Sequence, residues 1–339
     1  MKKREILLLV LLVLVFCTGI VSWVGASVAK ASNKVFQKKS KGEIITDTVD
    51  LTEFKRIDLD VSSINAYIEP GDGYKLEYRA YKDNLPEIQE HNGKLVVKQP
   101  SHFRVRFIMF SNMFDNDEEF YKITVPKNSG LIDVDLNASS GRISVGDVDI
   151  NGRIDISSGN IDLENIKSEK LRLDATSGDI DIKNVELDEL SVDITSGNLD
   201  ASRCTTDELE CKLTSGRMDF EELKVNKVDF DMTSGDADLE IVGKEDDYSY
   251  DLDATSGSFK LNGKRIDDSY KTDGSKDKEI KAEMTSGSMS ISFEAGKTYT
   301  EREVNIIIAD FNDDFCTIRR DMVAEKLLSR DENNTYRLT

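Results

Sequence analysis

Regularly spaced carboxylates are the side chains of this sequence best suited to chemistry. They lie four residues before and three residues after a recurring glycine: Asp155, Asp174, Asp193 and Asp231, then Asp162, Asp181, Asp200, Asp219 and Asp238. Carboxylates stacked at the spacing of neighbouring strands repel one another. Calcium is a hard cation that binds oxygen and would relieve this repulsion. These aspartates are therefore candidate cation ligands, and Ca²⁺ is the only cofactor that the sequence suggests.

A purely electrostatic explanation of the same columns stays open. Lys212 interrupts the first column, and Arg153 and Arg172 lie beside it, so cationic side chains could screen the aspartates. The sequence also lacks the Gly-Gly-x-Gly-x-Asp pattern of calcium-binding β-rolls. The alternative is an acidic face that water and neighbouring cations stabilise.

Catalytic chemistry has little support in the sequence. The two histidines, His91 and His102, lie outside the repeats, so no Ser-His-Asp or Cys-His set is indicated. No P-loop, Rossmann glycine run, CxxC or HExxH occurs. We expect no catalytic residues and no enzyme activity.

The glycines that frame the carboxylates belong to a repeated Thr/Ser-Ser-Gly tripeptide. Their successive spacings are 18, 19, 19, 19, 19, 22 and 30 residues, for Gly141, Gly159, Gly178, Gly197, Gly216, Gly235, Gly257 and Gly287. A fixed period near 19 indicates one structural unit copied along an axis. Glycine tolerates the backbone of a tight turn, so each tripeptide is expected to be a corner.

Apolar residues alternate on both sides of each corner. In one repeat, Leu171, Leu173 and Ala175 precede the Ser-Gly step, and Ile180 and Ile182 follow it. Period-two alternation predicts two short strands with one buried face. The positions five and three before the glycine, and two and four after it, are apolar in every repeat.

These columns predict an all-β fold, a β-solenoid of ~19-residue T-S-G repeats, in which equivalent residues stack into inward ladders. A meander of hairpins with Ser-Gly turns is the alternative. A mostly apolar position seven after the glycine favours the solenoid, because it requires a second corner. That corner is expected near the charged stretches 168–170, 186–189 and 205–208.

The regions around the repeats divide the chain. Residues 42–130 form a β-rich N-terminal cap region, 131–295 the solenoid repeats, and 296–339 a C-terminal tail. In the tail we expect a strand at 304–309, a short helix at 322–328 and a frayed end at 329–334. The apolar stretch 103–120 could dock to a membrane or a partner, or be buried by the cap.

Residues 1–31 form a targeting segment, followed by a spacer at 32–41. Lys2, Lys3 and Arg4 precede an apolar stretch from Ile6 to Gly25, which is long enough for one transmembrane helix. An uncleaved anchor, a cleaved signal peptide and lipidation at Cys17 are alternatives. Each places residues 32–339 outside the cytoplasm, anchored to the cell membrane or secreted.

Charge and cysteine content limit the partners. The chain has 339 residues, a formal net charge of −20 and a pI near 4.6, which argues against nucleic-acid binding. Cys204 and Cys211 occupy inward positions of the repeat. They could fill the core as small apolar groups, form a disulfide or hold a metal.

The repeat T-S-G-x-[IL]-x-[IV], the preceding β-region with Ile123-Thr-Val-Pro126 and one N-terminal membrane segment together resemble the bacterial "putative adhesin" family of β-strand-repeat proteins, domain of unknown function 4097. The resemblance covers roughly residues 50–295. It implies a β-solenoid, an extracytoplasmic location in Gram-positive bacteria and, for some members, a role in envelope-stress sensing. It implies no catalytic residues.

Two functions are compatible with these observations. The first is an adhesin-like binding protein of the cell envelope that presents an acidic solenoid surface to a cell-wall or protein ligand. The second is a membrane-anchored regulator that senses antimicrobial peptides or envelope damage. A regulator would require a membrane partner, because only about five residues precede the apolar segment.

Overall fold

The computed structural model describes residues 43–100, 119–294, 299–309, 314–324, 327–330 and 335–338. The predicted targeting segment, His102 and residues 103–118 of the apolar stretch lie outside these ranges. Within them, no helix is long and apolar enough to cross a membrane.

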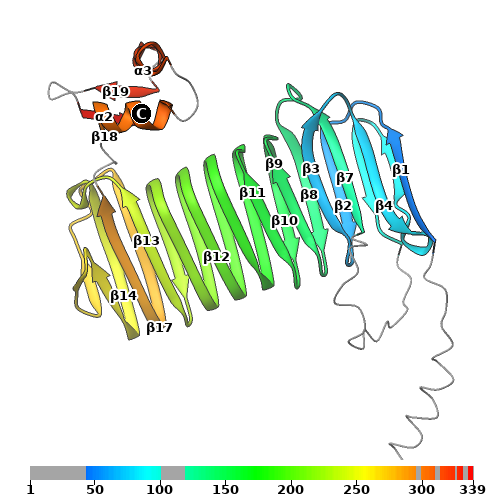
Figure 1. Ribbon diagram of the computed structural model, residues 1–339. Coiled ribbons are helices and arrows are strands. Elements are labelled where there is room, and N and C mark those ends of the chain that lie inside the picture. The colour runs from blue at the N-terminus through cyan, green and yellow to red at the C-terminus, as the bar shows by residue number, and fades with distance from the viewer. Residues whose placement is uncertain are drawn as a thin grey trace, which may run out of the picture. The chain divides into compact units, whose positions relative to one another are not determined.

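The repeats form a parallel coil. Its central rungs are built from β8 (Ile132–Ala138), β9 (Arg142–Gly146), β10 (Ile150–Ile156), β11 (Asn160–Glu164), β12 (Lys167–Met232) and β13 (Asp236–Val242) (Figure 1). The extended backbone of β12 continues through the corners and covers several rungs. Each strand pairs in parallel with its equivalent one repeat away, as Ile154 does with Leu173. This parallel register confirms the solenoid and rules out the meander of hairpins.

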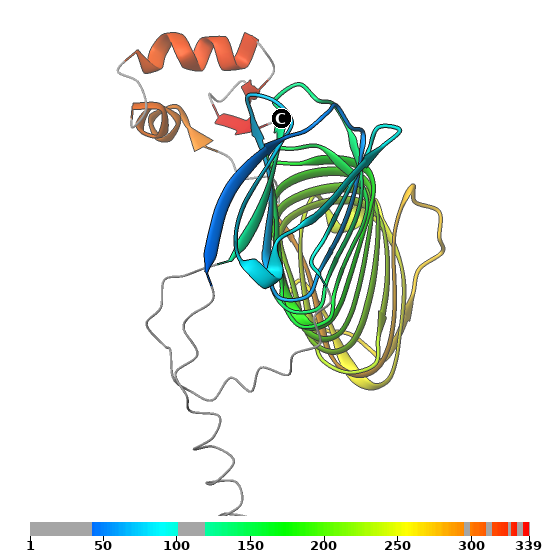
Figure 2. The same ribbon diagram turned by 90° about the vertical axis from the view of Figure 1, so that its right-hand side faces the viewer.

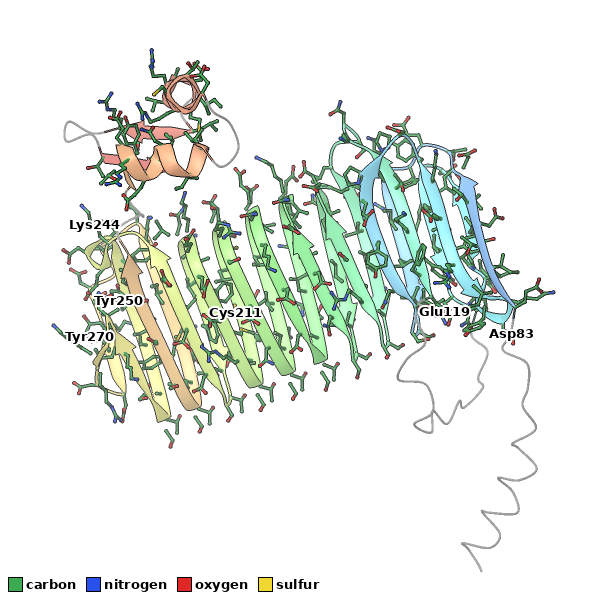
Figure 3. All side chains as sticks on the ribbon, in the orientation of Figure 1. Asp83, Glu119, Cys211, Lys244, Tyr250 and Tyr270 are labelled. Atoms are coloured by element: carbon green, nitrogen blue, oxygen red, sulfur yellow. The ribbon has the colours of Figure 1, made fainter. Side chains whose placement is uncertain are left out.

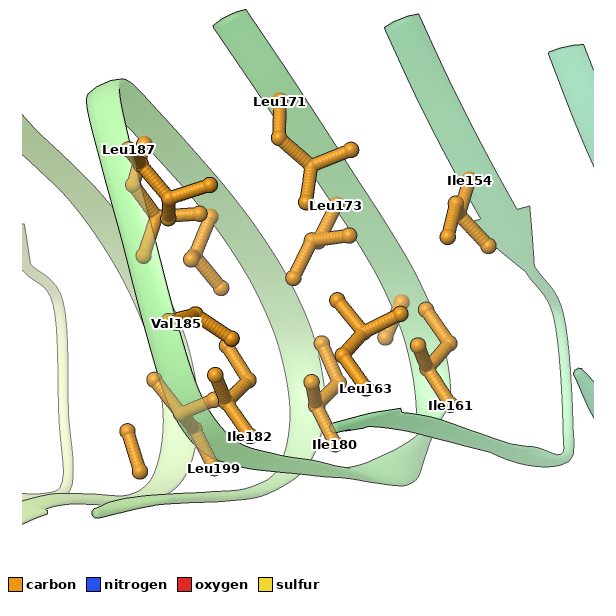
Figure 4. Packing of buried hydrophobic residues seen from close by; sticks show 14 of the residues in the cluster. Ile154, Ile161, Leu163, Leu171, Leu173, Ile180, Ile182, Val185, Leu187 and Leu199 are labelled. Atoms are coloured by element: carbon orange, nitrogen blue, oxygen red, sulfur yellow. The ribbon is translucent and has the colours of Figure 1, made fainter. Parts of the chain in front are cut away.

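The interior of the coil is a continuous apolar core. Every residue of the four predicted columns is buried, and the side chains stack from rung to rung (Figure 4). Burial of one Leu or Ile side chain contributes roughly 1.5–3 kcal/mol. One further inward column lies nine residues after the glycine, with Ile150, Leu187 and Val225 and two buried hydroxyls. Ser168 Oγ donates to Asn151 Oδ1 at 2.9 Å, and Thr206 Oγ1 to the Glu208 carbonyl at 2.9 Å, so both hydroxyls are satisfied.

The second corner begins with a residue in the left-handed backbone conformation. Asp147, Asn165, Asn184, Arg203 and Glu222, each six residues after a corner glycine, have φ values of 54–56°. The chain bends again at the predicted charged stretch, where Asn151 Oδ1 accepts the backbone N–H groups of Glu169 and Lys170. Seen along the axis of the coil, from its N-terminal end, the rungs overlie one another (Figure 2).

The C-terminal end of the coil does not follow chain order. β17 (Lys278–Glu294) pairs on one side with β12 and β13, and on the other with β14 (Tyr248–Leu261). The last repeat in the sequence is therefore the penultimate rung in space, and β14 is the final one. Two short strands, β15 (Lys264–Arg265) and β16 (Ser269–Lys271), run antiparallel to β14 and cover its edge. Tyr270 of β16 packs on Tyr250 with ring centroids 5.9 Å apart (Figure 3).

The N-terminal end uses a similar arrangement. β2 (Arg56–Val61) and β3 (Asn65–Gly71) pair with the first regular rung, β8 and β9. β6 (Lys94–Lys98) and β7 (Phe120–Pro126), which come later in the chain, lie outside them. β1 (Ile44–Asp50), β4 (Lys75–Tyr81) and β5 (Glu87–His91) complete this end, with β4 antiparallel to β7, β5 antiparallel to β6, and β1 paired with β4. This cap removes the open edge that the coil would otherwise expose.

Residues from 299 onward form a small unit with its own core. It contains β18 (Tyr299–Thr300), α2 (Glu301–Ala309), α3 (Phe315–Ala324), β19 (Leu328–Arg330) and β20 (Thr335–Leu338). Among its described residues, the buried apolar side chains are Val304, Ile308, Leu328 and Tyr336.

One prediction for this unit is wrong, because the strand expected at 304–309 belongs to helix α2. Two others are wrong in part: the helix expected at 322–328 begins earlier, at Phe315, and ends at Ala324, and residues 329–330 of the end expected to be frayed belong to β19. Val304 and Ile308 have helical spacing, four residues apart, which the run of isoleucines obscured. A capping box begins α2, because Thr300 Oγ1 accepts the Glu303 N–H at 3.3 Å and Glu303 Oε2 accepts the Thr300 N–H at 2.7 Å.

Candidate functional site

The coil presents two long outward faces. The first face is formed by the strands before the Ser-Gly corners, and the second face by the strands after them. Asp155, Asp174, Asp193 and Asp231 lie on the first face, and Asp162, Asp181, Asp200, Asp219 and Asp238 on the second. Register pairs such as Asp155 with Asp174 and Asp162 with Asp181 show that the predicted columns stack.

Arginines neutralise much of the first face. Arg153 contacts Asp155 at 2.8 Å and Asp174 at 2.7 Å, so one guanidinium bridges two rungs. Arg172 contacts Asp174 at 2.6 Å and Asp193 at 3.6 Å. The alternative in which neighbouring cations screen the aspartates therefore describes this part of the first face. Lys212 forms its ion pair with Glu210 at 2.8 Å, and its charge also interacts with Asp193 of the column.

The second face is neutralised at two places and left acidic between them. Arg142 contacts Asp162 at 2.7 Å, and Arg217 contacts both Asp219 and Asp238 at 3.0 Å. Asp181 and Asp200 stand between these ion pairs. Among the described residues, neither has a Lys or Arg nitrogen within 4.0 Å.

Burial raises the pKa of the Asp200 carboxyl, and the neighbouring carboxylates Asp181 and Asp219 raise it further, while Arg217 acts in the opposite direction. The folded protein therefore holds a carboxylate whose negative charge is poorly compensated. A cation brought to this point would lower the free energy of the ionised form.

The structure gives the calcium hypothesis no coordination set. Within the described ranges, no group of three or more His, Cys, Asp or Glu side chains is placed to hold a metal ion. The aspartates lie side by side along a ladder. A cation site at these positions stays a prediction.

A hollow of 610 Å³ lies at the N-terminal end of the second face. Its polar lining consists of Asn65, Tyr67, Arg142, Ser144, Asn160 and Asp162. Asn65 and Tyr67 come from β3, whose pairing with β9 brings them beside the repeats. The sequence analysis did not single them out, because Ile64 replaces the corner glycine in this rung, although the alternating apolar pattern from Ile57 to Ile68 continues around Ser62 and Ser63. This pattern places Tyr67 in the same column as Ser144, three residues after the corner position.

A second hollow, of 500 Å³, lies on the first face around Gly152. Its lining combines the core residues Ile57 and Val134 with several charged residues. Arg56 contacts Asp133 at 3.4 Å, and Lys94 contacts Asp58 at 2.8 Å, so these two cations of the lining already have partners.

The remaining candidate residues have structural surroundings. Cys204 and Cys211 are buried as free thiols, in agreement with their inward positions. Burial raises the pKa of the Cys204 thiol to about 12 and that of the Cys211 thiol well above its usual value. His91 is exposed on β5, with its Nε2 2.8 Å from Asn92 Nδ2.

Comparison with known families identifies this architecture. The Toastrack family, DUF4097, matches residues 54–292, which run from the β2 rung to β17. The chain belongs to the Toastrack DUF4097 family. The resemblance inferred from the repeat is thereby confirmed, and in this Toastrack chain the matched region contains both outward faces.

The C-terminal unit of the Toastrack chain has a separate similarity. Residues 283–338 match DUF2087, described as an uncharacterized protein conserved in bacteria. The match begins within β17 and continues through both helices to β20.

Several solved structures resemble the chain. A "putative adhesin" from Bacteroides fragilis has 14% identity and a TM-score of 0.46, covering 75% of this chain and 98% of its own. A "putative lipid binding protein" from Parabacteroides distasonis has 16% identity and a TM-score of 0.44, with the same coverage. A "putative adhesin" from Parabacteroides distasonis has 11% identity and a TM-score of 0.40, covering 74% and 98%. At these values the likeness adds nothing to the assignment of function. No curated protein matches the chain.

Proposed function

We propose that this Toastrack chain is a non-enzymatic binding protein of the cell envelope whose second face binds a cationic peptide segment. The observation that carries the proposal is the pair Asp181 and Asp200. These carboxylates lie between arginine-paired aspartates and have no ion pair among the described residues. Complementary charge attracts a ligand and sets its register along a rigid surface.

The rest of the fold supports a binding role. The inward side chains of the repeats form the core. Only the outward positions can therefore change residue type without loss of packing. Outward side chains repeat at rung spacing, about 4.8 Å. An extended peptide with lysines or arginines could therefore contact successive rungs along the second face.

The proposed location rests on residues 1–31, where Lys2, Lys3 and Arg4 precede the apolar stretch. Cys316 is exposed and can report the location. In intact cells, a membrane-impermeant maleimide should label the wild type at Cys316 and leave a Cys316→Ser variant unlabelled there. Labelling of Cys316 only after permeabilisation would contradict an extracytoplasmic location.

The binding proposal is tested with the full chain and a hexalysine peptide. Asp181→Asn with Asp200→Asn should weaken hexalysine binding by about threefold to tenfold, because two charge contacts at the protein surface are lost. Isothermal titration calorimetry at low salt measures the change. Added salt should weaken wild-type binding more than binding by the double variant, since salt screens exposed charges.

The matched control is Glu169→Gln with Asp188→Asn. It removes the same two charges from exposed positions at the corner, away from the second face. Unchanged affinity in the control and weaker affinity in the Asp181/Asp200 variant support the proposal. Equal weakening in both would show that hexalysine responds only to net charge, and the proposal would fail.

Stability gives an independent readout for Asp200. Its folded-state pKa is raised above the unfolded value, so the ionised form destabilises the folded state at neutral pH. That destabilisation disappears as the pH falls below the pKa that Asp200 has in the unfolded chain, because the carboxyl is then protonated in both states. Asp200→Asn should therefore raise the melting temperature at pH 7 and leave it nearly unchanged at pH 3. Binding that weakens while stability rises would mark Asp200 as a functional residue.

A further inference from the structure

The hollow at the N-terminal end of the second face differs chemically from the acidic region beside it. Arg142 Nη1 lies 2.7 Å from Asp162 Oδ2, so the two charged groups of its lining neutralise each other. The remaining polar lining consists of the Asn65 and Asn160 amides, the Ser144 hydroxyl and the Tyr67 phenol. Such a site has no net charge to attract an ion, and it is rich in hydrogen-bonding groups.

The hollow exists because a small residue stands between two large ones. Ser144 is in register with Tyr67 on one side and with Asp162 on the other. The corner glycines beside it, Gly141 and Gly159, add no side chains. A Cβ on either would lie within 3.0 Å of a carbonyl oxygen of the preceding rung, so these positions are restricted to glycine.

The walls of the hollow are fixed in place. The Arg142 backbone N–H donates to Asn65 Oδ1 at 2.9 Å, which orients the Asn65 amide at the corner. The Tyr67 ring packs edge-on against Phe120 of β7, with ring centroids 6.4 Å apart. Because β7 and β9 flank β3 on opposite sides, Phe120 supports Tyr67 on the side away from Ser144. Preorganised walls reduce the entropy cost of binding.

A carbohydrate matches this set of groups. Planar amide, carboxylate and guanidinium groups can each contact two neighbouring hydroxyls of a sugar. An aromatic ring offers an apolar face to the C–H groups of the sugar ring and a hydroxyl at its tip. Ligand sites commonly combine an aromatic surface with a few convergent polar groups. A simple anion would have to compete with Asp162 for Arg142, and a simple cation with Arg142 for Asp162.

We infer that the hollow between Tyr67 and Asp162 is a binding site for a neutral saccharide, with Ser144 as its floor. The site goes beyond the proposed function, because it uses neither Asp181 nor Asp200. It gives the second face two contacts of different chemistry, a sugar site at one end and a cation-binding region along the rungs.

The test uses the full chain and four neutral probes: the tetrasaccharides of N-acetylglucosamine, glucose in α-1,4 linkage, glucose in β-1,4 linkage, and mannose. Saturation-transfer NMR detects binding, and calorimetry measures affinity. At least one probe should bind saturably. Ser144→Gln, which fills the hollow and removes none of its walls, should reduce the affinity by at least about tenfold.

The matched control is Ser290→Gln. Ser290 occupies the position of Ser144 in the column three residues after the corner glycine, at the other end of the coil. This control should bind the saccharide like the wild type. Tyr67→Ala should also reduce affinity, whereas Tyr67→Phe should keep the aromatic contact and lose less. Thermal melting confirms that each variant is folded.

Three results would overturn the inference: no binding of any of the four probes, saccharide binding that persists in Ser144→Gln, or equal loss in Ser144→Gln and Ser290→Gln. The outcome is separable from that of the proposed function. Ser144→Gln should leave hexalysine binding intact, and the Asp181/Asp200 variant should leave saccharide binding intact.

Discussion

Five residues at the second corner share a left-handed backbone but differ in how well they suit it. Asp147, Asn165 and Asn184 are of the types that tolerate positive φ. They also form a side-chain ladder, in which Asn184 Nδ2 donates to Asn165 Oδ1 at 3.0 Å and Asn165 Nδ2 donates to Asp147 Oδ1 at 3.0 Å. The Arg203 Nε donates to Asn184 Oδ1 and so extends this ladder by one rung. Glu222, with φ of 54°, has a side chain that can only accept when ionised.

Glu222→Asn should therefore stabilise the protein by about 1 kcal/mol, because asparagine tolerates this conformation better. The midpoint of urea unfolding measures the gain. Glu221→Asn is the control, since it removes the same charge from the adjacent residue, which has an ordinary φ. A larger gain from the control would show that charge, and not backbone conformation, limits stability here.

At the scale of the element, the rung depends on how closely its corner approaches the next. A Cβ on Gly216 would lie 1.9 Å from the Gly197 carbonyl oxygen, and the φ of Gly216 is +133°. Glycine is therefore required in this column for two reasons: neighbouring rungs approach closely there, and the backbone turns. This explains why the Ser-Gly step persists in every repeat while the outward residues around it vary.

Gly216→Ala should destabilise the coil by about 3–5 kcal/mol, because two rungs would have to separate or a strained backbone would have to persist. Gly146→Ala is the matched control. Gly146 lies in β9, has no positive φ and has no atom within 4 Å of an added Cβ. Thermal melting of the full chain compares the two. A similar melting temperature for both variants would contradict the close-approach argument.

At the scale of the whole molecule, the ends of the coil are closed by rungs out of chain order. The spatial order of corner glycines at the C-terminal end is Gly235, Gly287, Gly257, as the contacts of Gly287 with Gly235 and of Gly257 with Gly287 show. At the N-terminal end, the β2–β3 rung lies between β6–β7 and β8–β9. Antiparallel strands cover both ends.

Paired cysteines test this order directly. Asp238 is in register with Ser290, and Ser290 with Lys260, so Asp238 and Lys260 lie two rungs apart. In a chain with Cys17→Ser and Cys316→Ser, Asp238→Cys with Ser290→Cys should oxidise to a disulfide. Asp238→Cys with Lys260→Cys should not, because roughly 9.6 Å is beyond disulfide reach. Peptide mass spectrometry reads both outcomes. A disulfide between positions 238 and 260 would favour chain order.

The predictions for the C-terminal unit show where local pattern misleads. The three consecutive isoleucines at 306–308 suggested a strand, whereas the capping box of Thr300 and Glu303 marked a helix start. The capping signal is the more specific of the two, because a capping box forms only at the N-terminus of a helix. A short apolar run is compatible with a helix or a strand.

The sequence by itself determined the repeat, its corners and its inward columns, because period-two alternation around a fixed glycine leaves only one side of each strand for the core. It also placed the aspartates in two outward columns. Only the tertiary structure decided which aspartates pair with arginine and which stand alone, since Arg142, Arg172 and Arg217 reach carboxylates on other rungs. It alone decided the rung order at both ends and brought Tyr67 beside Ser144. Such contacts depend on which strands become neighbours, and a long connection in the sequence does not specify that.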